Sequence, residues 1–342
     1  MRICVISSTV FSVPLLNYGG LEQIAYQQAK GLAALGHEVS LVAPQGSYCP
    51  NVTVIPTGPP GHWDEKTAYG GYWQELLKFD AIIDHSWCKW SYVLKMEGRL
   101  QAPVLGAMHA PVNSMYQSLP QLEKPCFVCI SKDQANHFEA LYSKPAKVCY
   151  NGVDLDFYKP TGVPRTNRFL FLARFSSIKG ADLAIDACKA AGVGLDLIGD
   201  TTITNEPDYF NQCKAKCDGQ QIRMVGPASR SETIHWFSQA HCMLHPNRIF
   251  REPYGLAPVE AQACELPVVS WNFGAMRETI KHGETGFLVT SLQGMIDVIK
   301  SDATNTIKRS YCREWVYSQF TEQHMIARIA ELCQEAVEGG EW

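Results

Sequence analysis

Short apolar runs alternate with helical patterns along almost the whole chain, and this alternation constrains the fold more than any other feature. Strands that alternate with helices predict mainly parallel sheets covered by helices on both faces, and two such series predict two doubly wound domains. In the first half the expected strands are 3–7, 39–43, 52–55, 81–84, 104–108, 127–130 and 147–150. In the second half they are 169–173, 195–198, 222–225, 242–245, 268–270 and 287–289. Helical stretches such as 21–35, 182–190, 231–240 and 259–264 lie between the strands.

The chain of 342 residues is long enough for two domains of ordinary size. We expect the boundary between residues 154 and 168, because Pro160, Gly162 and Pro164 lie there between two apolar strands. The expected domains are an N-terminal Rossmann-like domain over 1–155 and a C-terminal one over 165–315. The segment 306–338 has an all-helical pattern, with apolar residues near helical spacing.

Composition excludes several classes of protein. Hydrophobic residues make up 46% of the chain and charged residues 19%, as in a globular protein with an ample core. The formal net charge of −4 argues against a nucleic-acid partner. No stretch approaches the ~18 uninterrupted apolar residues of a transmembrane helix. The apolar start is also too short for a secretory signal.

The cysteines indicate the compartment. Thirteen of them are scattered along the chain, and an odd, dispersed set favours free thiols in a reducing cytoplasm. Cys126 and Cys129 have the spacing of a metal or redox motif. A metal site is nevertheless disfavoured, because no second pair of cysteines or histidines completes it.

Glu252 and Glu260 are separated by seven residues, with Gly255 shortly after the first and an apolar helical pattern around the second. A Gly turn that leads into a helix presents unpaired backbone N–H groups, which suit an anion or sugar hydroxyls. We expect Glu252 to precede the helix. The pair is therefore interpreted as two hydrogen-bond acceptors that bracket one ligand, not as a general acid/base couple.

Further candidate binding residues follow strands in both halves. Gly19 and Gly20 follow the first strand and open a helix, where a doubly wound domain binds phosphates, although an ordinary turn explains a Gly pair alone equally well. Arg174 ends a strand and Lys179 starts a helix. Two cations at the carboxyl end of a strand can neutralise a diphosphate, whereas either one alone is more simply a surface residue.

Taken together, these features resemble the retaining glycosyltransferases of the GT-B fold, specifically family 4 (glycosyltransferase group 1). The similarity extends from residue 1 to about residue 338. Its elements are Gly19-Gly20, Gly36-His37-Glu38-Val39, Asn151-Gly152-Val153-Asp154, Arg174 with Lys179-Gly180, Glu252-x7-Glu260, Gly274-Ala275-Met276-Arg277-Glu278 and the segment 283–289. The resemblance implies two Rossmann-like domains that face each other across a cleft. The N-terminal domain would bind the acceptor and the C-terminal domain the donor, and a helix over 316–342 would return to the N-terminal domain.

The resemblance also implies roles for the glutamates and the residues beside them. Glu252 matches the glutamate that contacts hydroxyls of the donor sugar, and Glu260 matches the one that accepts from the ribose. The backbone N–H groups around Tyr254, Gly255 and Leu256 would hold the sugar and the phosphate.

Other residues match groups around the diphosphate and the sugar. Arg174 and Lys179 match the pair that stabilises the leaving diphosphate, and Gly19 and Gly20 match the loop that approaches it from the other domain. His109 follows a strand of the N-terminal domain and matches a histidine on the C6 side of the donor sugar. A structural role for His109 is an equal alternative. His85 follows the preceding strand, where the family often has a histidine, and packing is the role considered for it.

The implied reaction proceeds on one face of the donor sugar and needs no cofactor or metal; we find no Asp-x-Asp motif. The expected donor is a nucleotide-diphosphate sugar, with UDP preferred and GDP as the alternative. The expected acceptor is a saccharide or glycoconjugate, because aromatic faces pack on sugar rings, although ordinary core packing explains most of the rings. The aromatic residues concerned are Trp63, Trp73, Trp87 and Trp90.

Three alternatives stay open. The first is an interfacial amphipathic helix over 87–99 that makes a peripheral membrane contact with a lipid-linked acceptor. The second is a sugar-nucleotide epimerase or hydrolase on the same fold, because a fold does not determine its function. The third is a non-catalytic partner that only binds sugar nucleotides.

Overall fold

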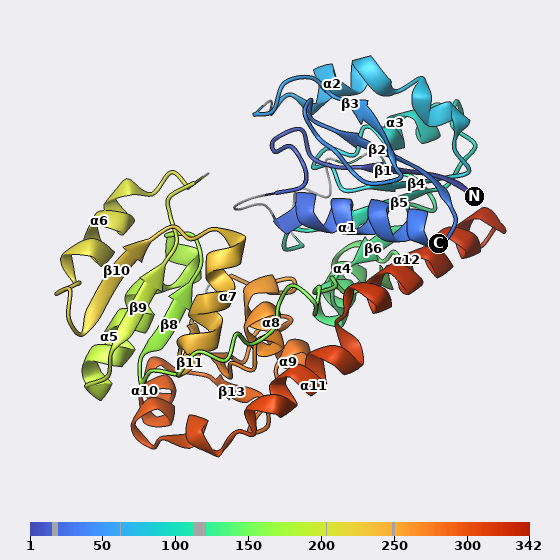
Figure 1. The fold of residues 1–342 in the computed structure, drawn as a ribbon. Helices are drawn as coiled ribbons and strands as arrows, with labels where there is room; N and C mark the ends of the chain where they lie inside the picture. The colour runs from blue at the N-terminus through green and yellow to red at the C-terminus, as the bar shows by residue number, and fades with distance from the viewer. Residues whose placement is uncertain (16–19, 62, 113–118, 120, 203, 248–249) are drawn as a thin grey trace. The chain divides into compact units, whose positions relative to one another are not determined.

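The protein consists of two compact units, seen in a computed structural model that describes residues 1–15, 20–61, 63–112, 119, 121–202, 204–247 and 250–342 (Figure 1). Unit 1 contains Met1–Gly152 and Glu322–Trp342, and unit 2 contains Val153–Thr321. These divisions differ from the expected ones, because the chain passes into unit 2 directly after Gly152 and returns only at Glu322. The helix expected over 316–342 is in fact two helices, α11 (Arg309–Gln319) and α12 (Glu322–Val337), and only α12 belongs to unit 1.

Unit 1 is built on a seven-stranded parallel sheet in the order β3-β2-β1-β4-β5-β6-β7. The strands are β1 (Arg2–Ile6), β2 (Glu38–Ala43), β3 (Thr53–Pro56), β4 (Ala81–Asp84), β5 (Val104–Met108), β6 (Phe127–Cys129) and β7 (Lys147–Val148). Their central members are continuous apolar runs, as expected of a parallel sheet covered on both faces. Helices α2 (Glu65–Tyr72) and α3 (Ser91–Met96) lie on one face, and α1 (Gly20–Ala34) and α12 lie on the other (Figure 1).

The return of α12 to unit 1 depends on a buried stripe that contains Met325, Ile329 and Leu332. The Met325 sulfur accepts a hydrogen bond of 3.2 Å from the Gly152 amide, and Gln27 of α1 donates to Glu322 at 3.2 Å. The remaining described elements of unit 1 are the helix α4 (Lys132–Tyr142) and the short 3-10 helix η1 (Glu75–Lys78).

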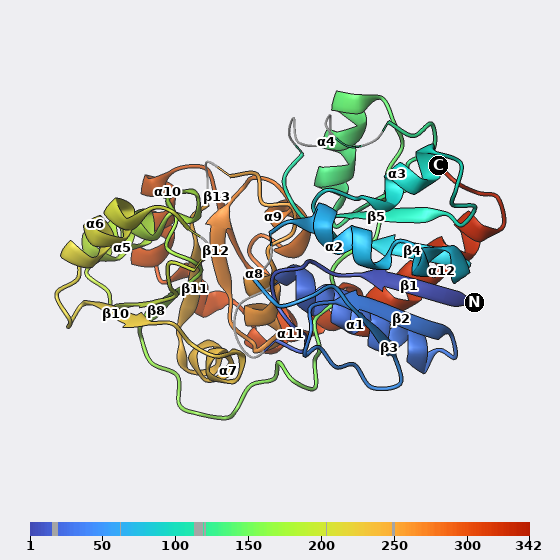
Figure 2. The ribbon, with the colours of Figure 1, turned by 90° about the horizontal axis from the view of Figure 1, so that it is seen from above.

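Unit 2 is built on a six-stranded parallel sheet in the order β10-β9-β8-β11-β12-β13. The strands are β8 (Phe169–Leu172), β9 (Leu195–Ile198), β10 (Ile222–Gly226), β11 (Cys242–His245), β12 (Val268–Trp271) and β13 (Gly286–Val289). Helices α5 (Ala181–Ala191) and α10 (Leu292–Lys300) cover one face, and α7 (Arg230–Gln239) and α8 (Leu256–Ala263) cover the other (Figure 2). The smaller elements are α6 (Pro207–Ala215), α9 (Met276–Thr279), η3 (Ser177–Lys179) and η4 (Ala303–Thr306).

The predicted fold class is confirmed. Every strand expected from the sequence is present, with its ends within two residues of the expected positions. The strand order of unit 2 is that of a Rossmann domain, in which the order reverses between the first and fourth strands. This reversal determines where a ligand can bind.

Arg165 of the expected linker joins the ends of two helices in unit 2. Its Nη1 donates to the carbonyls of Phe237 and Ala240, both at 3.0 Å, at the end of α7. Its Nη2 donates to Cys264 at 3.0 Å and to Glu265 at 3.1 Å, after the end of α8. A cation at a helix C-terminus satisfies carbonyls that have no partner within the helix. Burial lowers the pKa of Arg165 to about 10, so it remains charged at neutral pH.

We expect Arg165→Met to lower the free energy of unfolding by about 3 kcal/mol, because hydrogen bonds to a charged group are strong and four carbonyls lose their donor. Urea denaturation monitored by circular dichroism measures this loss. Arg223→Met is the matched control, because Arg223 is exposed on β10, and its expected effect is within about 0.5 kcal/mol. Equal effects of the two substitutions would contradict the assignment.

Candidate functional site

The predicted donor residues of unit 2 follow the two strands at which the sheet order reverses. Arg174 and Lys179 follow β8, and Glu252 follows β11, its neighbour. In open α/β sheets, ligands bind outside the carboxyl ends of the strands at this reversal. Topology therefore brings these residues, far apart in the sequence, to one edge of the sheet.

Lys179 and Glu252 form an ion pair with 2.5 Å between Nζ and Oε2. The Lys179 side chain is only 13% exposed and the Glu252 side chain 12%. Asn247 donates from Nδ2 to the same oxygen at 3.0 Å. The sequence predicted both charged residues as site residues but did not predict that they contact each other.

Glu252 is ionised at neutral pH. Burial acts to raise the pKa of Glu252, but the charge of Lys179 and the hydrogen bonds from Lys179 and Asn247 outweigh burial, and the pKa lies below its ordinary value. His245 ends β11, and its Nε2 lies 3.8 Å from the Glu252 carboxylate. Burial lowers the pKa of His245 to about 4, so the ring is neutral, and its buried Nε2 has no hydrogen-bond partner among the described residues. The sequence analysis did not select His245 or Asn247; the signal that could have found them is their position at the end of a central strand.

Helix α8 begins immediately after this ion pair. Gly255 occupies its N-cap position with φ of 82° and supplies no side-chain hydrogen bond, as the predicted Gly turn requires. Glu252 precedes the helix, and Tyr254, Gly255 and Leu256 lie at its start. The predicted backbone donors are therefore located at a helix N-terminus, where they suit an anion.

Glu260 lies further along α8 and has its own neighbours. Burial raises the pKa of Glu260, and the charge of Arg230 and a hydrogen bond from Tyr158 oppose this shift. Arg230 lies at the start of α7, and its guanidinium stacks over the rings of Phe157 at 5.1 Å and Tyr158 at 5.8 Å. Sequence reasoning missed Arg230 and Tyr158, because no motif spacing connects them to Glu260.

Arg174 lies in the loop after β8, near a second carboxylate. Hydrogen bonds from Ser176 and Ser177 lower the pKa of Glu206, and the charge of Arg174 adds to this effect. Lys179 in turn lies over the ring of Phe250, with 4.8 Å between Nζ and the ring centroid. The loop after β8 thus presents two cations at the sheet edge, each already near an acidic residue.

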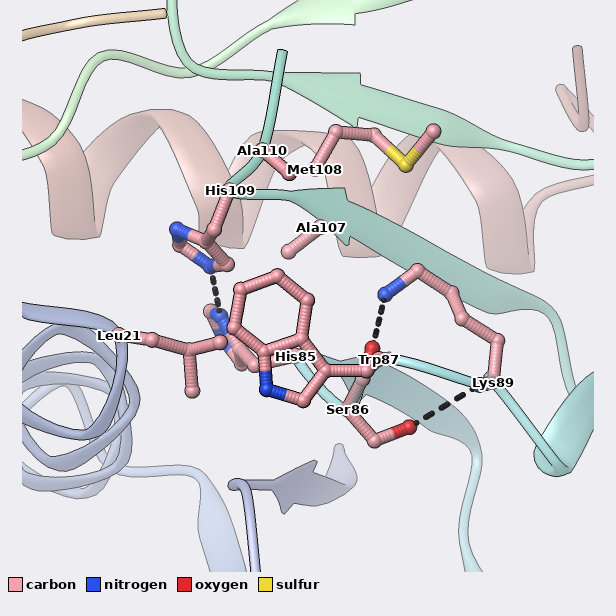
Figure 3. A pocket seen from close by; sticks show the side chains of 9 residues that line it. All are labelled: Leu21, His85, Ser86, Trp87, Lys89, Ala107, Met108, His109 and Ala110. Carbon is pink, nitrogen blue, oxygen red and sulfur yellow. Dashed lines mark hydrogen bonds between the residues drawn. The ribbon is translucent and has the colours of Figure 1, made fainter. Parts of the chain in front are cut away.

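In unit 1, His85 and His109 follow β4 and β5, which are neighbouring parallel strands. His85 Nδ1 lies 2.7 Å from His109 Nε2, and the rings are stacked with 5.0 Å between centroids (Figure 3). The two imidazoles line a small pocket together with Leu21, Ser86, Trp87, Lys89, Ala107, Met108 and Ala110. Of the predicted glycine pair, Gly20 begins α1, and Gly19 lies outside the described residues.

The aromatic residues proposed for the acceptor divide into two groups. Trp73 packs under Arg99 at 4.2 Å, and Trp90 stacks on Tyr69 with 5.9 Å between centroids. Trp63 and Trp87 are 62% and 39% exposed. Of these four rings, Trp63 and Trp87 are therefore the ones available for a ligand.

The alternative of an amphipathic helix over 87–99 corresponds to a shorter helix in the structure. Helix α3 contains only Ser91–Met96, and Tyr92 and Leu94 point into the core of unit 1. Of the apolar residues of that alternative, Leu94 is thus used for packing, whereas Trp87 is 39% exposed, and the membrane contact stays a prediction. Within the described ranges, no helix is long and apolar enough to cross a bilayer.

The cysteines are free thiols throughout. Burial raises the pKa of Cys126 to about 11 and that of Cys129 well above its ordinary range. In the part of the chain that the structure describes, no group of three or more His, Cys, Asp or Glu side chains has the arrangement of a metal site.

Comparisons with known proteins agree on the family. Residues 157–314 match the family described as glycosyl transferases group 1, and residues 18–157 match glycosyltransferase family 4. A relative named D-inositol 3-phosphate glycosyltransferase 1, from Catenulispora acidiphila, is 24% identical over 94% of this chain and 92% of its own length.

Two solved structures share the fold. Sucrose-phosphate synthase from Thermosynechococcus elongatus has a TM-score of 0.82 at 18% identity and covers 99% of both chains. The Anabaena protein HepE in complex with UDP and glucose has a TM-score of 0.76 at 18% identity, over 97% of this chain and 98% of its own. At this level of identity the structural similarity supports the two-domain architecture alone.

Proposed function

This chain belongs to the group 1 glycosyltransferases of family 4, and from that premise we propose that it transfers a hexosyl-type sugar, with retention of configuration and without a metal, from UDP-sugar to a saccharide or glycoconjugate hydroxyl. Glycosyl transfer from a nucleotide sugar is the family's activity. The donor base, the stereochemistry, the metal independence and the acceptor are our proposals. The Lys179–Glu252 ion pair at the start of α8 is the observation that carries the proposed metal-independent transfer.

Charge on the departing diphosphate is the main obstacle that the site must overcome. Lys179 has three N–H donors, and Glu252 accepts one of them, which leaves donors for a phosphate oxygen. Arg174 from the same loop and the N–H groups of Tyr254, Gly255 and Leu256 add positive potential. A preorganised donor of this kind contributes ~3 kcal/mol to transition-state stabilisation in a site that excludes water. These cations take the role that a metal ion has in other transferases.

The carboxylates position the donor. Glu252 is ionised and held by Lys179 and Asn247, and its remaining lone pairs can accept from sugar hydroxyls. Glu260 is positioned by Tyr158 and Arg230 and would accept from the ribose hydroxyls. No protein nucleophile is needed if the acceptor attacks the face that the diphosphate leaves, and the leaving phosphate then takes the acceptor's proton.

Among the possible bases we propose UDP, because the Anabaena structural neighbour is in complex with UDP and glucose. The preference for a saccharide-type acceptor is supported by the exposed Trp63 and Trp87, whose ring faces can pack on a sugar. Relatives named D-inositol 3-phosphate glycosyltransferases support a polyhydroxylated acceptor of this general kind.

We expect one UDP-sugar in a panel of UDP-, GDP- and ADP-sugars to raise the melting temperature. A ligand that binds only the folded state at 100 times its Kd adds about 2.7 kcal/mol of stability. The same UDP-sugar should be turned over in the presence of a chelator, with the anomeric configuration retained in the product as measured by proton NMR. Inversion would contradict the stereochemistry proposed. Turnover without acceptor and without a new glycosidic bond would instead identify an epimerase or hydrolase.

A further inference from the structure

His85, His109 and Gln28 form a chain of three polar side chains in unit 1, of which His85 and Gln28 are buried and His109 is half-buried. His85 Nε2 lies 3.0 Å from the Gln28 oxygen Oε1, and His85 Nδ1 lies 2.7 Å from His109 Nε2. The His85 and Gln28 residues are 1% and 4% exposed, respectively. Three elements contribute to the chain: Gln28 is on α1, His85 follows β4, and His109 follows β5.

Both imidazoles are neutral. Burial lowers the pKa of His109 to about 3, and the charge of Lys89 adds to the effect. Burial also lowers the pKa of His85 far below its ordinary value, with His109 and Lys89 contributing. Lys89 donates to the carbonyls of Asp84 and Ser86, at 2.9 and 2.8 Å. The Asp84 carboxylate accepts from the amide and hydroxyl of Ser86 and from the hydroxyl of Ser91.

The direction of the hydrogen bonds follows from the amide oxygen. Because Gln28 Oε1 can only accept, the proton of His85 is on Nε2. A neutral imidazole has one N–H, so His85 Nδ1 is an acceptor. The facing nitrogen, His109 Nε2, must therefore donate, and His109 Nδ1 is left with a lone pair. Figure 3 shows the second nitrogen of His109 on the side of the ring turned away from His85.

We propose that His85 is a positioning residue that, together with Gln28, holds His109 in the Nε2–H tautomer and makes His109 Nδ1 a fixed hydrogen-bond acceptor in this pocket. Such an acceptor selects a ligand group that donates, such as a sugar hydroxyl. A carbonyl or carboxylate at the same place would meet a lone pair and be rejected. The identity of the ligand as a sugar rests on the proposed function, whereas the tautomer does not.

The tautomer can be measured without any ligand. Protein labelled with 15N-histidine gives long-range 1H–15N spectra in which protonated and unprotonated ring nitrogens are resolved, and His109→Gln identifies the His109 signals by their loss. We expect a protonated Nε2 and an unprotonated Nδ1 for His109 at neutral pH. A protonated Nδ1 in the wild-type protein would overturn the proposal, whether or not any variant folds.

His85→Phe and Gln28→Met test whether His85 and Gln28 cause His109 to favour the Nε2–H tautomer. His85→Phe removes the acceptor for His109, and Gln28→Met removes the acceptor for His85 at nearly unchanged length. In each variant we expect the excess of the Nε2–H tautomer of His109 to fall about tenfold, the effect of one hydrogen bond. An unchanged tautomer ratio in His85→Phe would show that His85 only packs.

Kinetics separate a positioning role from general damage. In His85→Phe, kcat/KM should fall about tenfold for the intact donor and little for the monodeoxy donor that lacks the contacted hydroxyl, because only the intact donor uses His109 Nδ1. An equal fall for every donor in a monodeoxy series would contradict the proposal. If no nucleotide sugar is turned over at all, the proposed function fails and the tautomer spectrum still decides the present inference.

Discussion

Replacement of Lys179 by Met should lower turnover about 100- to 1,000-fold, which is the effect of removing one preorganised donor from a developing negative charge. It should also lower the free energy of unfolding by about 3 kcal/mol, because Glu252 would remain as a buried carboxylate without its cation. Steady-state kinetics with saturating donor and urea denaturation measure the two effects separately.

The double variant Lys179→Met with Glu252→Gln distinguishes the two effects. A neutral amide at position 252 removes the unpaired charge and still accepts the hydrogen bond from Asn247, so most of the stability should return. Turnover should stay low, because the diphosphate still lacks its cation. Recovery of turnover together with stability would mean that Lys179 acts only as the partner of Glu252.

The stability loss should depend on pH in a defined direction. In the wild-type protein the pKa of Glu252 is below its unfolded value, so the ionised group stabilises the fold above that value and less as the pH falls. Without Lys179, burial is opposed only by weaker partners, and the pKa of Glu252 rises. The variant then loses stability as the pH rises through the unfolded value of about 4.3. The difference between the two proteins should therefore widen as the pH rises from below the unfolded value towards neutrality.

Lys216→Met is the matched control. Lys216 also forms an ion pair, 2.8 Å from Asp186, but the two side chains are 39% and 42% exposed. An exposed ion pair contributes at most about 1 kcal/mol to stability. Asp186 lies on α5 and Lys216 follows α6, so this pair is not at the carboxyl ends of the strands. If Lys216→Met lowered the free energy of unfolding as much as Lys179→Met, burial of the ion pair would not determine the loss of stability.

Sequence predicts the strands of this protein well because each is a short apolar run buried on both faces. The segment Phe169–Leu172, with every side chain buried or half-buried, has little alternative to a central strand. The ends of helices and strands are harder to predict where they depend on tertiary contacts. The helix expected over 316–342 breaks at Phe320 and Thr321, because Val153 pairs with Thr321 and the Val153 amide donates to the Phe320 carbonyl. These contacts join residues that are far apart in the sequence.

In the candidate site, too, local sequence patterns can be predicted and tertiary contacts cannot. Glu252, Glu260 and Lys179 could be selected as candidates from the sequence, because each lies in a local pattern of a loop or a helix start. The pairing of Lys179 with Glu252 depends on which strands are neighbours, so it follows only from the sheet order β8-β11. His85 and His109 are paired for the same reason, through β4 and β5. In both units, side chains that the sequence does not pair are in contact at the carboxyl ends of adjacent parallel strands.

Gly180→Ala is the second substitution for which we expect a large loss of stability and turnover. Gly180, after β8, packs closely against Pro246, after β11. Gly180 has φ of 73°, and a Cβ there would lie 2.4 Å from the Pro246 carbonyl oxygen. Gly180 directly follows Lys179, and Pro246 directly precedes Asn247, so the clash separates the two groups that hold Glu252. We expect a loss of about 3 kcal/mol in stability, from about 1 kcal/mol of backbone strain and about 2 kcal/mol of overpacking.

Turnover of Gly180→Ala should fall at least about tenfold, since small displacements of positioning groups cost rate steeply. Gly192→Ala provides a control at the other end of α5. Gly192 has the same φ of 73°, and a Cβ there would meet no atom within 4 Å among the described residues. This control should cost only the backbone strain, about 1 kcal/mol, and leave turnover unchanged. Because both substitutions impose the same strain on the same helix, any difference between them measures the contact with Pro246. Equal stability and equal turnover in the two variants would show that this contact does not position Lys179 against Glu252.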